Sequence, residues 1–128
     1  MNCSGKGKQM DYISFFDKVG GSYDEVMSRL LKEERIQKYL TKFLSSTEYT
    51  DLKEALAAQN IEPAFRASHS LKGVCANLGL GTLMNSSSEL CEALRPLVLP
   101  DYDITPMVEK VDHDYAEAIN AIHQLIGD

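Results

Sequence analysis

The sequence predicts an all-α fold in which antiparallel helices form a bundle. Apolar residues recur at steps of three and four along most of the chain, which is the period of an amphipathic helix. Glycine, serine and proline separate the apolar runs at positions typical of helix ends. Alternation of apolar and polar residues never persists, and the hairpin dipeptides Asn-Gly and Asp-Gly are absent, so no strand is predicted. Long helices with short connections favour an antiparallel arrangement.

Two short helices are predicted near the N-terminus. The first has a weak apolar stripe, made of Met10, Ile13 and Phe16, and it ends at Gly20-Gly21. Ser22 stands three residues before Glu25, which is the spacing of a capping box and marks the start of the second helix. The apolar residues that follow are Val26, Met27, Leu30 and Leu31.

Three helical segments are predicted in the middle of the chain. One has its apolar stripe over residues 36–44 and ends at Ser45-Ser46-Thr47. The next contains Leu52, Ala55 and Leu56 and stops near Gln59-Asn60. A long helix then runs from about Ile61 to Leu78, with Asn60 as its cap, Pro63 in its first turn and Gly79 as its stop.

Two more helices complete the predicted bundle. The first starts near Gly81-Thr82, and its stripe consists of Leu83, Leu90, Leu94 and Leu97. Pro96, Pro100 and Pro106 enclose a loop, and Thr105-Pro106 opens the last helix in cap-then-proline order. The stripe of that helix consists of Val108, Val111, Tyr115, Ala118, Ile119, Ile122 and Leu125.

Length and composition limit the classes of protein to which this chain can belong. The 128 residues fit one domain, which we expect over residues 10–128, after a small, polar and flexible tail over residues 1–9. The formal charge of −6 disfavours nucleic acid and anionic membrane as partners, because both need a basic surface. Since neither a membrane span nor a signal peptide is visible, we expect a cytoplasmic protein.

Most of the cysteine, histidine and serine side chains are expected to have no catalytic or metal-binding role. The cysteines Cys3, Cys75 and Cys91 are odd in number and unpatterned, which favours reduced thiols packed inside over a disulfide framework or a nucleophile. His113 and His123 stand ten residues apart, and no Cys-x-x-Cys or His-x-x-x-His pair exists, so no metal site is predicted. No Gly-rich phosphate loop or Gly-x-Ser-x-Gly elbow occurs. Residues 86–88, three serines, are interpreted as a polar helix surface.

His69 differs from the other histidines because of its place in the helix predicted over residues 61–78. Successive helical residues turn by about 100°. His69 therefore points away from the predicted buried stripe, which consists of Ala67, Leu71, Val74 and Leu78. Its own face carries Phe65, Arg66, Lys72, Gly73 and Ala76. A core histidine is excluded on this geometry, which leaves either a solvated histidine without a role or a functional one.

Three neighbours favour a functional histidine. Lys72 lies one turn further on, where its ammonium can reach an anion carried by the imidazole. Gly73 costs about 1 kcal/mol relative to alanine inside a helix, which suggests close approach by another molecule, and Ala76 extends the same low surface. An exposed imidazole is a nucleophile near neutral pH, because its ordinary pKa is about 6.5. These features indicate a phosphoryl acceptor served by a partner protein.

The residues around His69 also resemble a known family. Residues 67–73 (Ala-Ser-His-Ser-Leu-Lys-Gly), followed by Ala-Asn-Leu-Gly at 76–79, closely resemble the signature of the histidine-containing phosphotransfer (HPt) domains of bacterial phosphorelays. The similarity includes the glycine turn within residues 16–22, the helix over 52–58 and the two long helices after the site. It covers about residues 10–126.

The resemblance implies a four-helix bundle with accessory N-terminal helices. His69 would match the phosphorylated histidine, and Lys72 the lysine that holds the phosphoryl oxygens. Gly73 would match the residue whose missing side chain leaves the histidine accessible. The implied partners are receiver domains of response regulators and a hybrid sensor kinase. The Mg²⁺ of the reaction belongs to the receiver, so we expect no metal or cofactor on this chain, and we expect a monomer.

The resemblance leaves the details of docking open. We expect Phe65, Arg66 and Ala76 to contact the partner, because they share the face of His69. The chain departs from the family in two places: Ser68 stands where alanine is frequent, and the loop over residues 97–105 is long and rich in proline. Neither departure puts phosphotransfer in doubt, but the loop could affect the choice of partner.

Two other functions remain as alternatives. The chain could be a helical adaptor that binds receiver domains without phosphotransfer, although the presence of His69, Lys72 and Gly73 on one face counts against this. It could also be an enzyme, such as a hydrolase or an autokinase, but no second catalytic group or nucleotide loop supports that function. We therefore expect a phosphoryl carrier rather than an enzyme.

Overall fold

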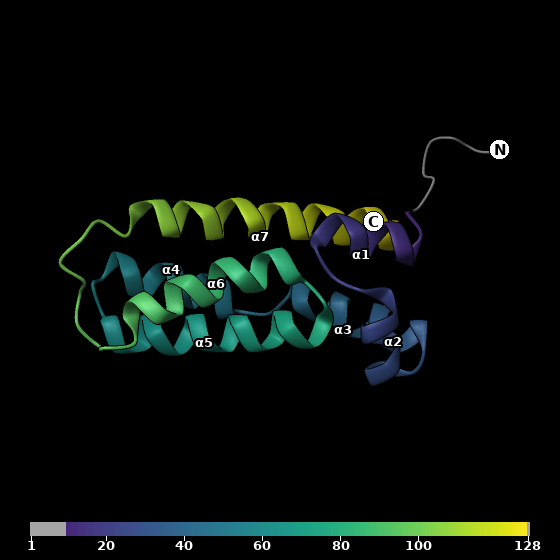
Figure 1. Ribbon diagram of the computed structural model, residues 1–128, viewed down its shortest axis with the longest axis horizontal. Helices are drawn as coiled ribbons and strands as arrows, with labels where there is room; N and C mark the ends of the chain where they lie inside the picture. The colour runs from purple at the N-terminus through teal and green to yellow at the C-terminus, as the bar shows by residue number, and fades with distance from the viewer. Residues whose placement is uncertain (1–9, 128) are drawn as a thin grey trace.

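The computed structural model describes residues 10–127, and seven α-helices and no strand are present in that part of the chain (Figure 1). The prediction of an all-α fold is confirmed, whereas the predicted tail over residues 1–9 lies outside the described residues. The helices are α1 (Tyr12–Val19), α2 (Tyr23–Leu30), α3 (Glu33–Leu44), α4 (Glu48–Ala57), α5 (Ile61–Leu78), α6 (Gly81–Leu94) and α7 (Thr105–Ile126).

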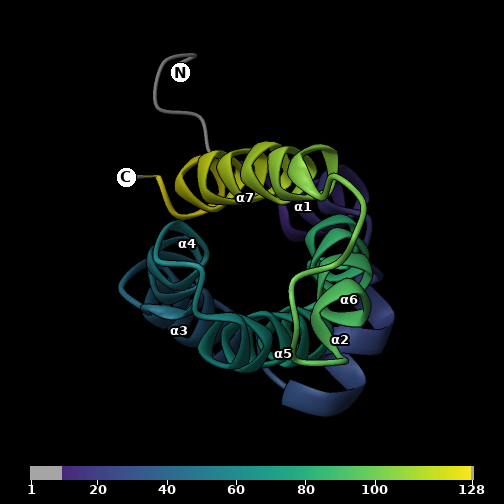
Figure 2. The same cartoon turned by 90° about the vertical axis from the view of Figure 1, so that its left-hand side faces the viewer.

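The bundle has four sides, of which α3 and α4 together form the first. They run in the same direction with a break at residues 45–47, and α5, α6 and α7 then alternate in direction (Figure 1). Viewed from the end, these helices surround a shared centre, with α1 beside α7 (Figure 2). The structure therefore confirms the predicted antiparallel four-helix bundle with accessory N-terminal helices.

The centre of the bundle is filled by aliphatic side chains from every side. The fully buried ones include Leu40, Leu52, Leu71, Leu90 and Ile122, which come from α3, α4, α5, α6 and α7 in turn. Burying a side chain of this size contributes ~1.5–3 kcal/mol. This core fixes the rotation of α5, and so decides which of its residues face solvent.

One residue of the stripe predicted for the first helix faces water. Phe16 is buried as predicted, but Ile13 is 60% exposed, and Phe15 and Val19 complete the inward face instead. The helix is only eight residues long, so its stripe is short, and two adjacent phenylalanines supply its largest buried side chains. Ser22 caps α2 as predicted: the backbone N–H of Glu25 donates to its Oγ at 3.3 Å.

Two helix ends also differ from expectation. Leu31 and Leu97, both assigned to helical stripes from the sequence, follow the last residues of α2 and α6. Each adopts a left-handed backbone, with φ of 73° and 65°, and each is exposed. The α6 helix ends at Leu94 because Pro96 has no backbone N–H to donate a helical hydrogen bond. The backbone of Arg95 is still helical, with φ of −56° and ψ of −37°, and the chain leaves the helical direction at the left-handed Leu97.

The predicted cap is in place at α5 but not at α7. Asn60 occupies the cap position of α5 as predicted, although its side chain makes no hydrogen bond to the helix. Thr105 is the first residue of α7, and its backbone N–H donates at 3.0 Å to Asp103, whose carboxylate takes the capping role that the sequence assigned to Thr105. The carboxylate fits this place because helix N-termini attract negative charge.

The predicted polar surface at the three serines is also wrong. Ser86 and Ser87 are buried, and the Ser86 hydroxyl donates to the Leu83 carbonyl at 3.2 Å. The α6 helix packs against α5 on one side and α7 on the other, so less of its circumference faces water than in a helix with one packed face. Small side chains allow its neighbours to approach closely.

Glycine turns join the accessory helices to the end of the bundle. The turn between α1 and α2, Gly20-Gly21, lies directly against the turn between α5 and α6, which contains Gly79 and Gly81. A Cβ on Gly21 would collide with the carbonyl oxygen of Gly79, and one on Gly81 with that of Gly20. Glycine is needed here because the two backbones touch.

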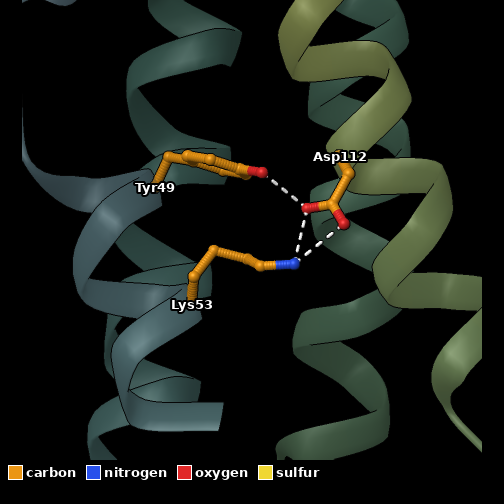
Figure 3. Close-up of polar contacts among 3 residues, drawn as sticks. All are labelled: Tyr49, Lys53 and Asp112. Carbon is orange, nitrogen blue, oxygen red and sulfur yellow. Dashed lines mark hydrogen bonds and ion pairs between the residues drawn. The ribbon is translucent and has the colours of Figure 1, made fainter. Parts of the chain in front are cut away.

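Long side chains, rather than close backbone packing, connect α4 to α7. The Tyr49 hydroxyl donates to Oδ1 of Asp112 at 2.6 Å, and Nζ of Lys53 donates to both carboxylate oxygens at 2.8 Å (Figure 3). The Tyr49 ring also stacks on Tyr115 at 3.9 Å between centroids. Burial raises the pKa of Tyr49, and the hydrogen bond to Asp112 raises it further, so the hydroxyl remains a donor.

Asp112→Asn should destabilise the protein, because it removes the charge that both donors share. Partial burial alone would raise the pKa of Asp112, but the hydrogen bonds from Lys53 and Tyr49 outweigh this and lower it. Both members of the ion pair are 36% exposed, so water screens it and we expect a loss of only ~1 kcal/mol in chemical denaturation at pH 7.

The pH dependence of this loss has a defined sign. A carboxyl whose pKa is lowered by folding contributes stability above its unfolded value of about 3.9, and that contribution disappears as the pH falls through the folded value. The difference between wild type and Asp112→Asn should therefore shrink below pH ~4. Glu109→Gln, an exposed change on the same helix, is the control and should leave stability unchanged. An equal loss in both variants would contradict the role of the cluster.

Candidate functional site

The α5 helix holds all the residues that the sequence predicts for the site. Its buried side chains are Ala64, Ala67, Ser68, Leu71, Cys75 and Leu78, and Val74 is half-buried rather than fully inside. His69, Gly73 and Ala76 are exposed on the other side of the helix, and Lys72 is half-buried. The predicted orientation of His69 away from the core is therefore present in the fold.

The His69 imidazole lies beside the aromatic ring of its neighbour one turn earlier. The Phe65 and His69 rings lie 6.1 Å apart between centroids at an angle of 44°. Within residues 10–127 no hydrogen bond occupies either ring nitrogen. The preceding residue, Ser68, is buried and donates its hydroxyl to the Phe65 carbonyl at 2.8 Å, so it does not contact the ring through a hydrogen bond. The ring is thus available to an incoming electrophile.

Lys72 supplies a positive charge beside the histidine. In the described part of the chain its ammonium makes no ion pair, unlike Lys53, Arg66, Arg95 and Lys110. Lys72 follows His69 by three residues on the same helix, so the two side chains are neighbours. An anion on the imidazole would therefore meet an ammonium that makes no ion pair among residues 10–127.

Gly73 leaves open space next to the histidine. A Cβ built at this position has no atom within 4 Å, in contrast to the glycines of the two touching turns. Packing inside the protein therefore does not require glycine here. Because glycine costs ~1 kcal/mol in a helix interior, its presence at an open position needs another reason, such as approach by a second molecule.

The three predicted docking residues differ in their surroundings. Phe65 is half-buried, and Arg66 is exposed and pairs with Glu62 at 2.6 Å. Ala76 is exposed, and its backbone carbonyl accepts a hydrogen bond from Arg29 of α2 at 3.1 Å. The side chain of Ala76 is therefore open to solvent while its backbone is tied to an accessory helix.

Glu92 in the last turn of α6 and Arg95, the residue that follows this helix, also belong to this face, and neither was predicted from the sequence. The guanidinium of Arg95 lies over the Phe65 ring, 5.3 Å from its centroid, and donates to both carboxylate oxygens of Glu92 at 3.0 and 2.6 Å. These bonds lower the pKa of Glu92 more than its slight desolvation raises it, and the charges of Lys72 and His69 lower it further. The site therefore contains a carboxylate whose charge an arginine balances. The available signal was the i,i+3 spacing of Glu92 and Arg95 at the end of a helix antiparallel to α5.

The other candidate groups do not form a second reactive centre. No group of three or more potential metal ligands lies within residues 10–127. Burial raises the pKa of the Cys75 thiol to about 12, with a smaller contribution from Glu48, so it stays protonated. Cys91 is also buried and free, whereas Cys3 lies outside the described residues. His113 is exposed and His123 is half-buried, and both lie on α7.

Comparison with known proteins gives a family for the chain. The family model of the Hpt domain matches residues 38–127, which is well over half of the sequence and contains the whole four-sided bundle after the start of α3. The comparisons with curated proteins and with solved structures return no match. None of the helices in residues 10–127 is both long and apolar enough to cross a membrane.

Proposed function

Because the chain belongs to the Hpt domain family, whose role is phosphotransfer in phosphorelays, we propose that it carries a phosphoryl group on His69. The partners in this proposal are receiver domains of response regulators, from which His69 takes the group or to which it gives the group, and a hybrid sensor kinase. The observation that supports it best is the juxtaposition on α5 of an exposed imidazole, an ammonium without an ion pair among residues 10–127, and an open glycine.

The proposed reaction transfers one group between two side chains. A neutral ring nitrogen of His69 attacks the phosphorus of the receiver's aspartyl phosphate, the N–P bond forms, the P–O bond breaks, and the carboxylate leaves on the receiver. Lys72 offsets the negative charge that arrives with the phosphoryl group. The reverse sequence returns the group to a receiver, so the chain acts as a carrier and not as a kinase or hydrolase.

Transfer from a labelled, phosphorylated receiver domain tests this proposal. The chain should acquire label that survives base and is lost in acid, as expected of a phosphoramidate. A chain that binds the receiver but never acquires label from any of a panel of receivers would instead be an adaptor.

Lys72→Ala should slow transfer without removing it. The ammonium neutralises part of a phosphoryl group that carries about two negative charges, but the site is open to water. We therefore expect a reduction of roughly tenfold at low salt that shrinks as salt is added. Lys18→Ala, an exposed lysine on α1, which packs beside α7 and not on the site helix (Figure 2), is the matched control. Equal rates for both variants at low salt would show that Lys72 has no part in transfer.

Gly73→Leu should change stability and transfer in opposite directions. Leucine is the better helix former by ~0.5–1 kcal/mol, and the space around position 73 is open, so unfolding should require more denaturant. The same side chain projects beside His69 and should obstruct the receiver, with Gly73→Ala intermediate in its effect on transfer. A stable Gly73→Leu protein that transfers at the wild-type rate would show that the receiver does not approach over this turn.

A further inference from the structure

An exposed apolar surface follows the last turn of α6. Seven large hydrophobic side chains are exposed within residues 10–127, and four of them lie in one short loop. We call these four the loop patch: Leu97 (46% exposed), Val98 (63%), Leu99 (54%) and Tyr102 (53%). Residues 96–100 contain no charged side chain, in a chain of which 25% is charged, whereas Tyr102 stands between Asp101 and Asp103. Concentrated apolar exposure of this kind marks interaction sites in soluble proteins.

The backbone of the loop holds this surface outward. Leu97 adopts φ of 65°, a left-handed conformation that is unfavourable for a residue with a branched side chain. Its backbone N–H still donates to the Leu94 carbonyl at 2.9 Å, so the turn is anchored to α6.

A groove beside the loop patch is suited to apolar side chains. It lies where the loop meets the end of α4 and the starts of α5 and α7, with a volume of about 540 Å³. Its apolar lining includes Leu56, Ile61, Leu99, Tyr102 and Val108. The loop patch and the groove share Leu99 and Tyr102. The loop that carries them lies at the end of the bundle opposite α1 (Figure 1).

This surface is continuous with the face of His69. The loop begins directly after Arg95, whose guanidinium covers Phe65, and Phe65 contacts His69. Ile61, in the groove lining, precedes His69 by eight residues, or ~12 Å along a helix. A specific protein partner covers about 800 Å² on each side, which is a disc of ~16 Å radius. A receiver centred on His69 would therefore reach the loop.

We propose that the loop patch is a docking contact for the receiver domain, and that it binds an uncharged, apolar area next to the receiver's phosphorylated aspartate. This inference rests on the proposed function. It adds a second contact surface for the receiver, outside α5. The patch acts on complex formation and not on the chemical step. Its removal should therefore affect transfer at low receiver concentration and leave the rate at saturation unchanged.

The test uses Val98→Ser/Leu99→Ser, with Ile13→Ser as a matched control. Both variants remove exposed apolar surface, but Ile13 is on α1 at the other end of the molecule. Each protein is labelled in two ways: by a phosphorylated receiver, and by phosphoramidate, a small donor that needs no docking surface. We expect Val98→Ser/Leu99→Ser to reduce receiver transfer at low concentration at least tenfold, with phosphoramidate labelling unchanged and the Ile13→Ser protein normal in both reactions.

Three results would overturn the docking proposal. The first is unchanged receiver transfer in Val98→Ser/Leu99→Ser. The second is an equal loss of labelling by the receiver and by phosphoramidate, because that loss would show that the substitutions disturb the fold or His69 itself. The third is a wild type that sediments as a dimer together with a double variant that sediments as a monomer, because the loop patch would then bind a second copy of the chain. Failure of the proposed function itself is distinguishable, because wild type would then take no label from any receiver, and the docking proposal would fall with it.

Discussion

His69→Gln should abolish phosphoryl acceptance while the protein remains folded. Glutamine cannot form the N–P bond, and the side chain it replaces is exposed and makes no hydrogen bond within residues 10–127. Substitutions at such positions usually change stability by less than ~0.5 kcal/mol. Transfer from a labelled receiver measures the first effect, and thermal unfolding measures the second.

The other two histidines provide controls for this experiment. His113 is exposed on α7 and His123 is half-buried on the same helix, so neither lies on the site helix. His113→Gln and His123→Gln should accept label at the wild-type rate. Persistence of label on His69→Gln, or its loss from either control, would move the acceptor away from α5.

Gly81→Ala should cause the largest loss of stability among the substitutions considered. The added Cβ meets the carbonyl oxygen of Gly20, which is backbone and cannot rotate away as a side chain can. Either the α1–α2 turn separates from the bundle or the start of α6 shifts. We expect a loss of ~3 kcal/mol and a fall in Tm of about 10 °C.

Gly73→Ala is the matched glycine substitution for this measurement. It introduces the same methyl group into open space on a helix, and should raise stability by ~0.5–1 kcal/mol. A Tm for Gly81→Ala equal to that of wild type would show that the two turns do not depend on each other. Gly21→Ala should behave as Gly81→Ala, since its Cβ meets the carbonyl oxygen of Gly79.

Much of the fold follows from patterns within single helices. The stripes and breaks at Gly20-Gly21, Ser45–Thr47 and Gly79 predict the helices of the bundle, because apolar period and helix-ending residues are local signals. The outward direction of His69 also follows from one helix alone. Its roles, and those of Lys72 and Gly73, stay predictions until transfer is measured.

The features that the sequence did not indicate depend on contacts between helices. The sequence predicts that Ser86 and Ser87 are exposed, because their burial comes from packing of α6 against helices on two sides. Arg95 and Glu92 join the site only because α6 returns antiparallel beside α5. Asp112 has no local partner, and the side chains that bind it stand about sixty residues earlier in the chain. Such contacts require the tertiary arrangement and not the helical period.

The central claim, that His69 carries the phosphoryl group, is tested most directly by locating that group. Wild type is mixed with a phosphorylated receiver, digested under neutral to basic conditions that preserve phosphohistidine, and analysed by mass spectrometry. We expect one phosphorylated peptide, with the group on His69 and none on His113 or His123. A phosphoryl group on any other residue would contradict the assignment, as would an unmodified chain after the receiver has lost its phosphate.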